Sequence, residues 1–293
     1  MAETIGFIGL GVMGEPMCRN VAQRSGRPVV AYDLSREPLE RLAAHGVTAA
    51  GSVAAVMRAA DMVMLVLPGG PQLEAVCNGP GGLLAHARAG QVVVDHGTSP
   101  VALTRALSEK FAAIGVAYAD APIARTRQAA EAGTLSIMVG ADAATMAAIT
   151  PILRCCADEV TLCGPVGSGQ VVKLMNNMVL FQTVVALCEA LAIGTAAGVD
   201  GAVLFNTLTK GSADSFALRN HGIKAILPDR FPERAFSTEY ALKDLSYALD
   251  LAEQAGLAPK GAAVAREYLN AAAERGLGKL YWPAISRVIA PQL

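Results

Sequence analysis

The hydrophobic positions of this chain follow different patterns in its two halves. Up to about residue 163, short apolar runs alternate with stretches in which apolar residues recur every three or four positions. Several runs are apolar throughout, as strands covered on both faces must be. The predicted strands are Ile5–Ile8, Val29–Tyr32, Met62–Leu67, Gln91–Val94, Val116–Ala119, Leu135–Val139 and Val160–Leu162. Strands that alternate with helices pair in parallel, so this half predicts an α/β fold with an open, doubly wound sheet.

The second half is predicted to be helical. The Gly/Pro-rich segment Gly164 to Gly169 ends the alternation and reads as a hinge. Helical periodicity then covers about 170–197, 200–210, 214–226, 238–255, 259–275 and 281–289. Ser237 or Thr238 is expected to cap the fourth of these helices, and Gly256 to end it. The expected domains are therefore residues 1–163, the doubly wound sheet, and residues 164–293, an all-α domain joined to it by a long helix.

Composition narrows the class of protein. The 293 residues are 53% apolar and 17% charged, which suits two domains with large cores and excludes wholesale disorder. A net charge of −1 without long runs of one sign gives no indication of nucleic acid or an anionic membrane surface as a partner. The six cysteines form no C-x-x-C pair and no set with histidine at ligand spacing, so we expect reduced thiols and no metal.

One apolar segment, Met178 to Val199, is long enough to be compared with a membrane span. Gln182, Thr183 and Glu189 interrupt it, and the sequence has no second such segment. A helix apolar on all sides is usually buried between domains or subunits in a soluble protein, and we interpret it so. The first strand starts at Thr4 without a basic leader, which indicates a cytoplasmic location.

A glycine-rich turn, Gly9-Leu10-Gly11-Val12-Met13-Gly14, joins the first strand to the first helix. Gly9 is expected to allow the tight turn, Gly11 to let the backbone approach a pyrophosphate, and Gly14 to let the helix pack on the strand. The N–H groups at the helix start would then face the phosphates. Asp33 ends the second strand at the spacing of the acidic residue that binds ribose hydroxyls, and its charge would repel a 2′-phosphate. The pattern predicts NAD as the cofactor.

Parallel sheets bind ligands at the carboxyl ends of their strands. Leu67-Pro68 closes one predicted strand and Asp95 follows another, so both are expected at this edge. Thr98 comes shortly afterwards. Its hydroxyl is expected either to reach the nicotinamide side of the cofactor or only to cap the next helix.

Hydride transfer from an alcohol needs a base for the hydroxyl proton, and the reverse reaction needs an acid. Lys173 and Asn177 are one helical turn apart just past the hinge, where the helix is expected to enter a crevice between the domains. Burial there would lower the pKa of Lys173 from about 10.4 towards about 7–8, which suits proton exchange at neutral pH. The alternative is an ordinary surface lysine. Lys243-Asp244 begins a later helix. This pair either reaches across the crevice or is an exposed ion pair, and spacing alone favours the exposed ion pair.

Two isolated histidines, His96 and His221, are weaker candidates for the base. Buried or exposed histidines without a catalytic role are commoner than catalytic ones. No zinc-ligand spacing links the two, which disfavours a metal-dependent alcohol dehydrogenase.

Taken together, these motifs resemble the β-hydroxyacid dehydrogenase family, which includes 3-hydroxyisobutyrate dehydrogenase and tartronate semialdehyde reductase. The resemblance covers nearly the full length, at Gly6 to Gly14, Asp120-Ala121-Pro122, Gly133-Thr134-Leu135, Gly164 to Gly169, Lys173 to Asn177 and Lys243-Asp244-Leu245. It implies a Rossmann-type domain plus a helical domain, with Lys173 as the catalytic acid/base and Asn177 orienting the substrate. It also implies that Thr98 and Lys243 contact the cofactor or line the site. Gln72 matches a position that often touches the cofactor, and members usually form homodimers or homotetramers.

The substrate loop departs from the family's common pattern. Most members have Ser-Gly-Gly after Asp-Ala-Pro-Val, where this chain has Ile123-Ala124-Arg125-Thr126-Arg127, and Gly97 stands where many have Ser. An Arg-Thr pair here resembles the sulfolactaldehyde reductase subgroup, in which the arginine binds a sulfonate. A guanidinium donates paired, charge-assisted hydrogen bonds to an oxyanion. We therefore expect Arg125, assisted by Thr126 and beside Ala124 and Gly97, to bind the acidic end of the substrate.

The sequence thus predicts an NAD(H)-dependent enzyme that interconverts a small anionic hydroxy acid or hydroxy sulfonate with its aldehyde or ketone. Candidate pairs are dihydroxypropanesulfonate and sulfolactaldehyde, glycerate and tartronate semialdehyde, and 3-hydroxyisobutyrate with its aldehyde. The alternatives are an NADPH-dependent imine reductase on the same fold, which typically lacks the lysine, and a non-catalytic nucleotide-binding subunit. A short-chain dehydrogenase needs Tyr-x-x-x-Lys, and the spacing of Tyr240 and Lys243 is one residue too short.

Overall fold

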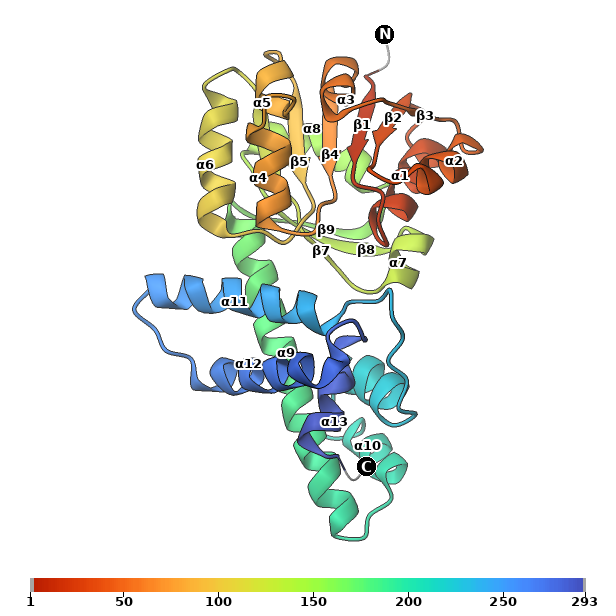
Figure 1. Cartoon of the computed structure of the whole chain (residues 1–293), viewed down its shortest axis with the longest axis vertical. Coiled ribbons are helices and arrows are strands. Elements are labelled where there is room, and N and C mark those ends of the chain that lie inside the picture. The colour runs from red at the N-terminus through yellow and green to blue at the C-terminus, as the bar shows by residue number, and fades with distance from the viewer. Residues whose placement is uncertain (1–2, 292–293) are drawn as a thin grey trace. The chain divides into compact units, whose positions relative to one another are not determined.

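One mixed sheet organises the first half of the chain, with helices on both of its sides (Figure 1). The computed structural model describes residues 3–291, which divide into a unit that ends at Lys173 and a unit that begins at Leu174. The strands of the first unit are β1 Ile5–Ile8, β2 Val29–Tyr32, β3 Val47–Ala49, β4 Met62–Leu65, β5 Val92–Asp95, β6 Ala117–Asp120, β7 Ile123–Ala124, β8 Leu135–Gly140 and β9 Ala157–Gly164. Its helices are α1 Gly14–Arg24, α2 Arg36–Ala43, α3 Val53–Ala59, α4 Gly70–Asn78, α5 Leu83–His86, α6 Val101–Ala112, α7 Arg127–Ala132 and α8 Ala143–Leu153.

The strand order is β3-β2-β1-β4-β5-β6-β8-β7, and β9 pairs with β8. From β3 to β6 every pairing is parallel. The register places Ile8 opposite Leu65, Leu65 opposite Asp95, and Asp95 opposite Asp120. The carboxyl ends of four neighbouring strands are therefore level, and the segments that follow them share one edge of the sheet.

The prediction of parallel pairing is wrong for one strand. β8 runs antiparallel to β6, with Asp120 opposite Gly140, and antiparallel to β7, with Ile123 opposite Ile137. The connection from β6 to β8 contains only the two-residue β7 and the six-residue α7. A parallel return needs a longer crossover, so the chain comes back in the opposite direction. The crossover through α8 then makes β9 parallel to β8.

Both faces of the sheet are buried, which confirms the doubly wound arrangement. One cluster of buried side chains unites the sheet with α1, α2, α7 and α8, and a second unites it with α3, α4, α5 and α6. Along β4, Met62 and Met64 belong to the first cluster, whereas Val63 and Leu65 belong to the second. Each such side chain contributes about 1.5–3 kcal/mol by leaving water. This two-sided core fixes the strand ends from which the candidate site is built.

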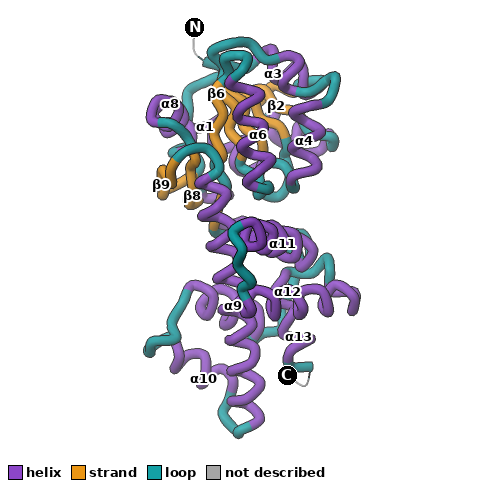
Figure 2. The backbone as a smooth tube through the Cα atoms, turned by 90° about the vertical axis from the view of Figure 1, so that its left-hand side faces the viewer, coloured by secondary structure: helices purple, strands orange, loops and turns teal. Residues whose placement is uncertain are grey.

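The second unit is helical, and Figure 2 shows no strand among its described residues. The 29-residue α9 Ser168–Ala196 starts before the unit boundary and continues beyond it. The further helices are α10 Gly201–Leu208, the π-helix η1 Leu218–Ile226, α11 Thr238–Gln254, α12 Lys260–Ala272, η2 Ala273–Leu277, the 3-10 helix η3 Trp282–Ile285 and α13 Ser286–Ile289. The predicted cap of α11 is confirmed, because Ser237 Oγ accepts from the Tyr240 N–H at 3.3 Å. Gly256, at φ 70°, follows the end of α11 as expected.

Aromatic residues hold α9 within the second unit. Phe181 of α9 is fully buried and meets the edge of Trp282 at a ring-centroid distance of 4.9 Å. Among the described residues, α9 is the one helix long and apolar enough to cross a membrane, yet only 33% of its most apolar window is buried. Val179 and Ile193 on this helix remain 58% and 71% exposed. The expected burial of this helix is therefore only partly achieved by the chain's own residues.

Candidate active site

The glycine-rich turn after β1 has three glycines in three different environments. Gly9 has φ 94°, and a Cβ there would lie 2.3 Å from the Val66 carbonyl oxygen. A Cβ on Gly14 would lie 2.1 Å from the Gly9 carbonyl oxygen, so the start of α1 packs directly on the turn. Gly11 is exposed, and a Cβ there would meet nothing within 4 Å. Sterics inside the protein therefore require glycine at positions 9 and 14, whereas position 11 faces open space.

Asp33, just beyond β2, is hydrogen-bonded to this turn. One carboxylate oxygen accepts from the Leu10 N–H at 2.6 Å, and the other accepts from the Ser35 N–H at 2.8 Å. A carboxylate has about four acceptor positions, so both oxygens keep capacity for a ligand's hydroxyl groups. Within the turn, Val12 is 41% exposed and Met13 is partly buried.

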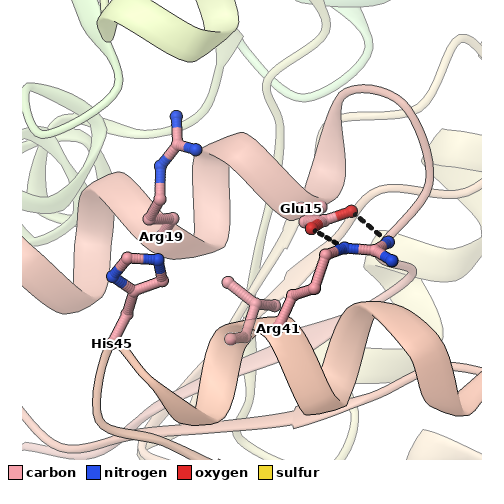
Figure 3. Close-up of a pocket in the computed structure, with 5 residues that line it drawn as sticks. Glu15, Arg19, Arg41 and His45 are labelled. Carbon is pink, nitrogen blue, oxygen red and sulfur yellow. Dashed lines mark hydrogen bonds and ion pairs between the residues drawn. The ribbon is translucent and has the colours of Figure 1, made fainter.

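An ion pair beside the turn neutralises the first acidic residue of α1 (Figure 3). Glu15 accepts from Arg41 Nε at 2.7 Å and from Arg41 Nη2 at 2.8 Å. These bonds hold the pKa of Glu15 below its usual range, so the carboxylate stays charged and paired. The pair, with Arg19, Leu42 and His45, lines a depression of about 300 Å³ between α1 and α2. Because Arg41 pairs with Glu15, this carboxylate does not leave an unpaired negative charge at the start of α1, which would repel an anion there.

The segments after β4 and β5 supply the neighbouring surface. Leu67 and Thr98 are partly buried, whereas Pro68 and Gln72 are exposed. Gly97 is buried, and its N–H donates to Asp95 Oδ1 at 2.9 Å. This N–H is therefore used inside the protein, at the end of β5.

Asp95 is fully buried, and burial raises its pKa to about 7. A Cβ at Gly97 would lie 3.0 Å from Asp95 Oδ1 and 3.0 Å from the Leu67 carbonyl oxygen. The larger residue that many family members carry at position 97 would be tight against this packing.

Asp120, which sequence reasoning used only as a family marker, anchors the start of α9. Its Oδ1 accepts from the Gly167 N–H at 2.6 Å, and its Oδ2 accepts from the Gln170 N–H at 2.7 Å. The carboxylate fills the space beside Gly140 and Gly169, where a Cβ would lie 2.3 Å and 2.8 Å from its oxygens. The partners are 47 and 50 residues away in sequence, so no local spacing indicates this cap.

Lys173 lies on the second turn of α9 and is partly buried, and Asn177 one turn later is 2% exposed. The full burial expected for Lys173 is thus not reached in this chain. Asn177 Nδ2 donates to Asp244 Oδ2 at 2.8 Å, and Asn177 Oδ1 accepts from Asn176 Nδ2 at 3.0 Å. These bonds fix which way the amide of Asn177 points.

The interpretation of Lys243-Asp244 as an exposed ion pair is wrong. Lys243 Nζ lies 2.7 Å from Asp244 Oδ1, but the Asp244 side chain is only 3% exposed and that of Lys243 23%. The ammonium also lies 4.9 Å from the centroid of the Tyr247 ring. A buried carboxylate needs compensating partners, and here Oδ2 accepts an amide hydrogen bond while Oδ1 forms an ion pair with the ammonium group. Asp244, which sequence reasoning did not place in the site, is thus the residue that joins Lys243 to Asn177.

Arg125 has a left-handed backbone, with φ 83°, at the position where the family pattern has glycine. Its Nη1 donates to the Thr134 carbonyl oxygen at 2.5 Å and lies 3.6 Å from Asp158 Oδ2. Within residues 3–291, no hydrogen bond of its Nε or Nη2 is found. Thr126 beside it is exposed, and Ala124 at the end of β7 is partly buried. Two donor nitrogens of the guanidinium thus remain available, although its position is restrained.

Neither candidate histidine is placed as a base. The Nδ1–H of His96 donates to the Ala121 carbonyl oxygen at 2.8 Å, and burial lowers the pKa of His96 to about 4. His221 is 5% exposed and lies 2.6 Å from the Tyr281 hydroxyl, and burial lowers its pKa to about 4 as well. Both rings are neutral at physiological pH and are held by structural contacts.

Comparison with known proteins identifies the family. Residues 4–164 match the family model for the NAD binding domain of 6-phosphogluconate dehydrogenase. Residues 167–289 match the model described as the NAD-binding domain of NADP-dependent 3-hydroxyisobutyrate dehydrogenase. The chain is 33% identical to 2-(hydroxymethyl)glutarate dehydrogenase of Eubacterium barkeri, over 97% of this chain and 94% of that protein. It is 30% identical to 2-hydroxy-3-oxopropionate reductase of Escherichia coli, over 97% of this chain and 96% of that protein.

A solved structure of Mycobacterium tuberculosis 3-hydroxyisobutyrate dehydrogenase, described with L-serine, superposes with a TM-score of 0.88. The two chains are 30% identical, and 99% of each is covered. The chain belongs to the β-hydroxyacid dehydrogenase family. It is an NAD(H)-dependent oxidoreductase that acts on small hydroxy acids. The glycine-rich turn fits such a cofactor, since Gly11 leaves its backbone open and Asp33 retains acceptor capacity.

Proposed function

We propose that, with NAD(H), the chain interconverts the primary alcohol and the aldehyde of compounds of the form HOCH2–CHX–COO⁻, or of a hydroxy sulfonate such as dihydroxypropanesulfonate, whose anion is one carbon further from the reacting carbon. The names of the relatives support this substrate class. 2-(Hydroxymethyl)glutarate, 3-hydroxyisobutyrate, 2-hydroxy-3-oxopropionate and L-serine all carry a hydroxymethyl or aldehyde carbon on the carbon that bears a carboxylate. These compounds differ only in X, so the reacting unit and the anion keep a constant separation.

The observation that carries the proposal is the arrangement of Lys173 and Asn177 on one face of α9. The bound nicotinamide supplies or accepts the hydride. Lys173 takes the hydroxyl proton during oxidation and returns a proton to the oxygen during reduction, which makes it the general acid/base. Asn177 is held through one amide hydrogen by Asp244, so its second amide hydrogen is left to donate to the substrate oxygen.

The anion of the substrate is assigned to the loop after β7. Arg125 offers Nε and Nη2, with Thr126 beside it, for paired charge-assisted hydrogen bonds. The Thr134 and Asp158 contacts of Nη1 reduce the freedom of the side chain, which lowers the entropy lost on binding. A carboxylate and a sulfonate both satisfy this recognition, and X is free to vary.

Substitution of the lysine tests the proposal. Lys173→Ala should lower kcat by about 10²–10⁴-fold, the usual contribution of a general acid/base, with the Kd for NADH unchanged. Lys210→Ala, at an exposed lysine beyond α10, is the matched control and should leave kcat unchanged. The substrates are 3-hydroxyisobutyrate, L-serine, 2-(hydroxymethyl)glutarate, glycerate and dihydroxypropanesulfonate, followed by NADH absorbance. A wild-type protein inactive on all five, or a Lys173→Ala variant with wild-type kcat, would contradict the proposal.

A second variant separates anion binding from chemistry. Arg125→Ala should raise KM for the substrates that are turned over by about 10–100-fold, because one or two charge-assisted hydrogen bonds are lost. The Kd for NADH should stay the same. An unchanged KM would show that Arg125 does not bind the anion of the substrate.

The proposal also includes a cytoplasmic location and self-association as a homodimer or homotetramer. The exposed apolar side chains of α9, Val179 and Ile193, would be covered in such an assembly. Sedimentation of the wild type should show an oligomer, and Ile193→Glu should shift it towards monomer. A monomeric wild type would contradict this part alone.

A further inference from the structure

Gln170 links two segments of the proposed site that are far apart in sequence. It lies on the first turn of α9, three residues before Lys173, and is fully buried. Its Oε1 accepts from the Ser99 N–H at 3.1 Å, and its Nε2 donates to the Gly97 carbonyl oxygen at 2.8 Å. These two backbone groups flank Thr98 on either side, so one side chain holds the backbone around that residue.

The same residue is also held by its own backbone. The Gln170 N–H donates to Asp120 Oδ2 at 2.7 Å, and the Asp120 carboxylate also caps Gly167. Gln170 is therefore fixed to the end of β6 through its main chain and to the segment after β5 through its side chain. Both ends of its amide are used, as a buried amide requires.

We infer that Gln170 is a positioning residue that sets Thr98 relative to Lys173. The inference rests on the proposed function, in which Lys173 exchanges the proton, and on the expectation from the sequence that Thr98 reaches the nicotinamide side of the cofactor. The side chain of Gln170 bonds only backbone groups of the segment after β5 among the described residues, so its removal takes away no group that touches the substrate. A displacement of about 1 Å in the reacting geometry can cost about 100-fold in rate. Loss of Gln170 should therefore lower the rate of the chemical step more than it weakens binding.

The chain offers a matched control in Gln91. This residue comes just before β5, whereas the backbone groups that Gln170 holds come just after β5. Gln91 is 1% exposed, and its Nε2 donates to the carbonyl oxygens of Met57 at 2.7 Å and Ala60 at 2.6 Å. Its Oε1 accepts from the Arg88 N–H at 2.6 Å. Gln91→Leu and Gln170→Leu thus each remove a buried amide with satisfied hydrogen bonds, and both should lower the thermal stability.

Kinetics and cofactor binding distinguish the two variants. Gln170→Leu should lower kcat by about 10–100-fold, with KM and the Kd for NADH, measured by fluorescence titration, changed by less than about threefold. Gln91→Leu should keep kcat within about twofold of the wild type. Gln170→Glu keeps the acceptor for the Ser99 N–H but loses the donor to Gly97, so its kcat should lie between those of the wild type and Gln170→Leu.

Hydrogen exchange provides a readout that is independent of turnover. The amide of Ser99 should exchange faster in Gln170→Leu and at the wild-type rate in Gln91→Leu. The inference is overturned if Gln170→Leu retains wild-type kcat, if Gln91→Leu loses as much kcat, or if Ser99 exchange is unchanged. A wild-type protein inactive on every substrate would refute the proposed function as well. An active wild type with an inactive Lys173→Ala and a normal Gln170→Leu would refute this inference alone.

Discussion

Two glycines of the same turn should respond in opposite ways to one added methyl group. At Gly11 the new Cβ would meet no protein atom within 4 Å, so Gly11→Ala should leave the free energy of unfolding nearly unchanged. At Gly14 the new Cβ would lie 2.1 Å from the Gly9 carbonyl oxygen, so the start of α1 would have to move away from β1. The first variant tests ligand binding, and the second tests the fold.

The expected magnitudes follow from these environments. In Gly11→Ala the methyl group would occupy the space where a pyrophosphate approaches the backbone. Loss of one or two hydrogen bonds to a charged group costs about 1.5–3 kcal/mol each, which raises the Kd for NADH by at least about tenfold. In Gly14→Ala overpacking should cost about 1–3 kcal/mol or more, a large share of a typical stability of about 5–15 kcal/mol.

Urea unfolding and NADH fluorescence titration measure the two effects separately. Gly11→Ala should have the wild-type unfolding midpoint but weak NADH binding, whereas Gly14→Ala should have a clearly lower midpoint. A folded Gly11→Ala variant that binds NADH as tightly as the wild type would show that the dinucleotide does not lie on this turn. Equal destabilisation by both substitutions would refute the steric argument.

Two further predictions concern carboxylates of the first unit. Asp33→Ala should shift the ratio of NADPH to NADH affinity towards NADPH by about tenfold or more. The reason is that an acceptor for the ribose hydroxyls and a charge that repels the 2′-phosphate are both lost. An unchanged ratio would show that Asp33 does not determine the choice of cofactor. Burial raises the pKa of Asp95 to about 7, so the folded state keeps this proton between about pH 4 and pH 7 while the unfolded carboxyl, with a pKa of about 3.9, releases it. The contribution of Asp95 to the free energy of unfolding of the wild type therefore falls as the pH rises through that window. Asp95→Asn should accordingly raise Tm above that of the wild type at about pH 8 but not at about pH 4, and a Tm difference independent of pH would contradict this.

Sequence reasoning predicted the elements whose signal lies in their own residues. β1 and β2 begin and end where expected, because strands buried on both faces are apolar along their whole length. Ser237 and Gly256 mark the ends of α11 through local chemistry. β3 and β7 were missed because they have three and two residues, respectively, and β3 has two exposed positions. The antiparallel direction of β8 was missed because it depends on how short the connection through α7 is.

The same distinction applies to the candidate site. The glycine-rich turn and Asp33 could be predicted because the chemistry of a phosphate-binding turn imposes a fixed spacing. Asp120 and Gln170 were not assigned roles, because their partners are backbone groups that any residue could supply. Asp244 was judged exposed because its partner Asn177 is 67 residues away, and spacing contains no information about that contact.

These contacts give a physical reason for two of the motifs that indicate the family. α9 is held by one carboxylate before Lys173 and by another after it. Asp120 accepts backbone N–H groups at the start of the helix, where the positive end of the helix dipole favours a negative charge. Burial raises the pKa of Asp120, and its hydrogen bonds to backbone N–H groups oppose that rise. Asp244 accepts from Asn177 one turn after the lysine. Charge-assisted bonds are stronger than neutral ones, so both contacts help to hold α9 in place on either side of Lys173. The aspartates of the Asp120-Ala121-Pro122 and Lys243-Asp244 motifs therefore have a structural reason to be where they are, since each accepts hydrogen bonds from α9.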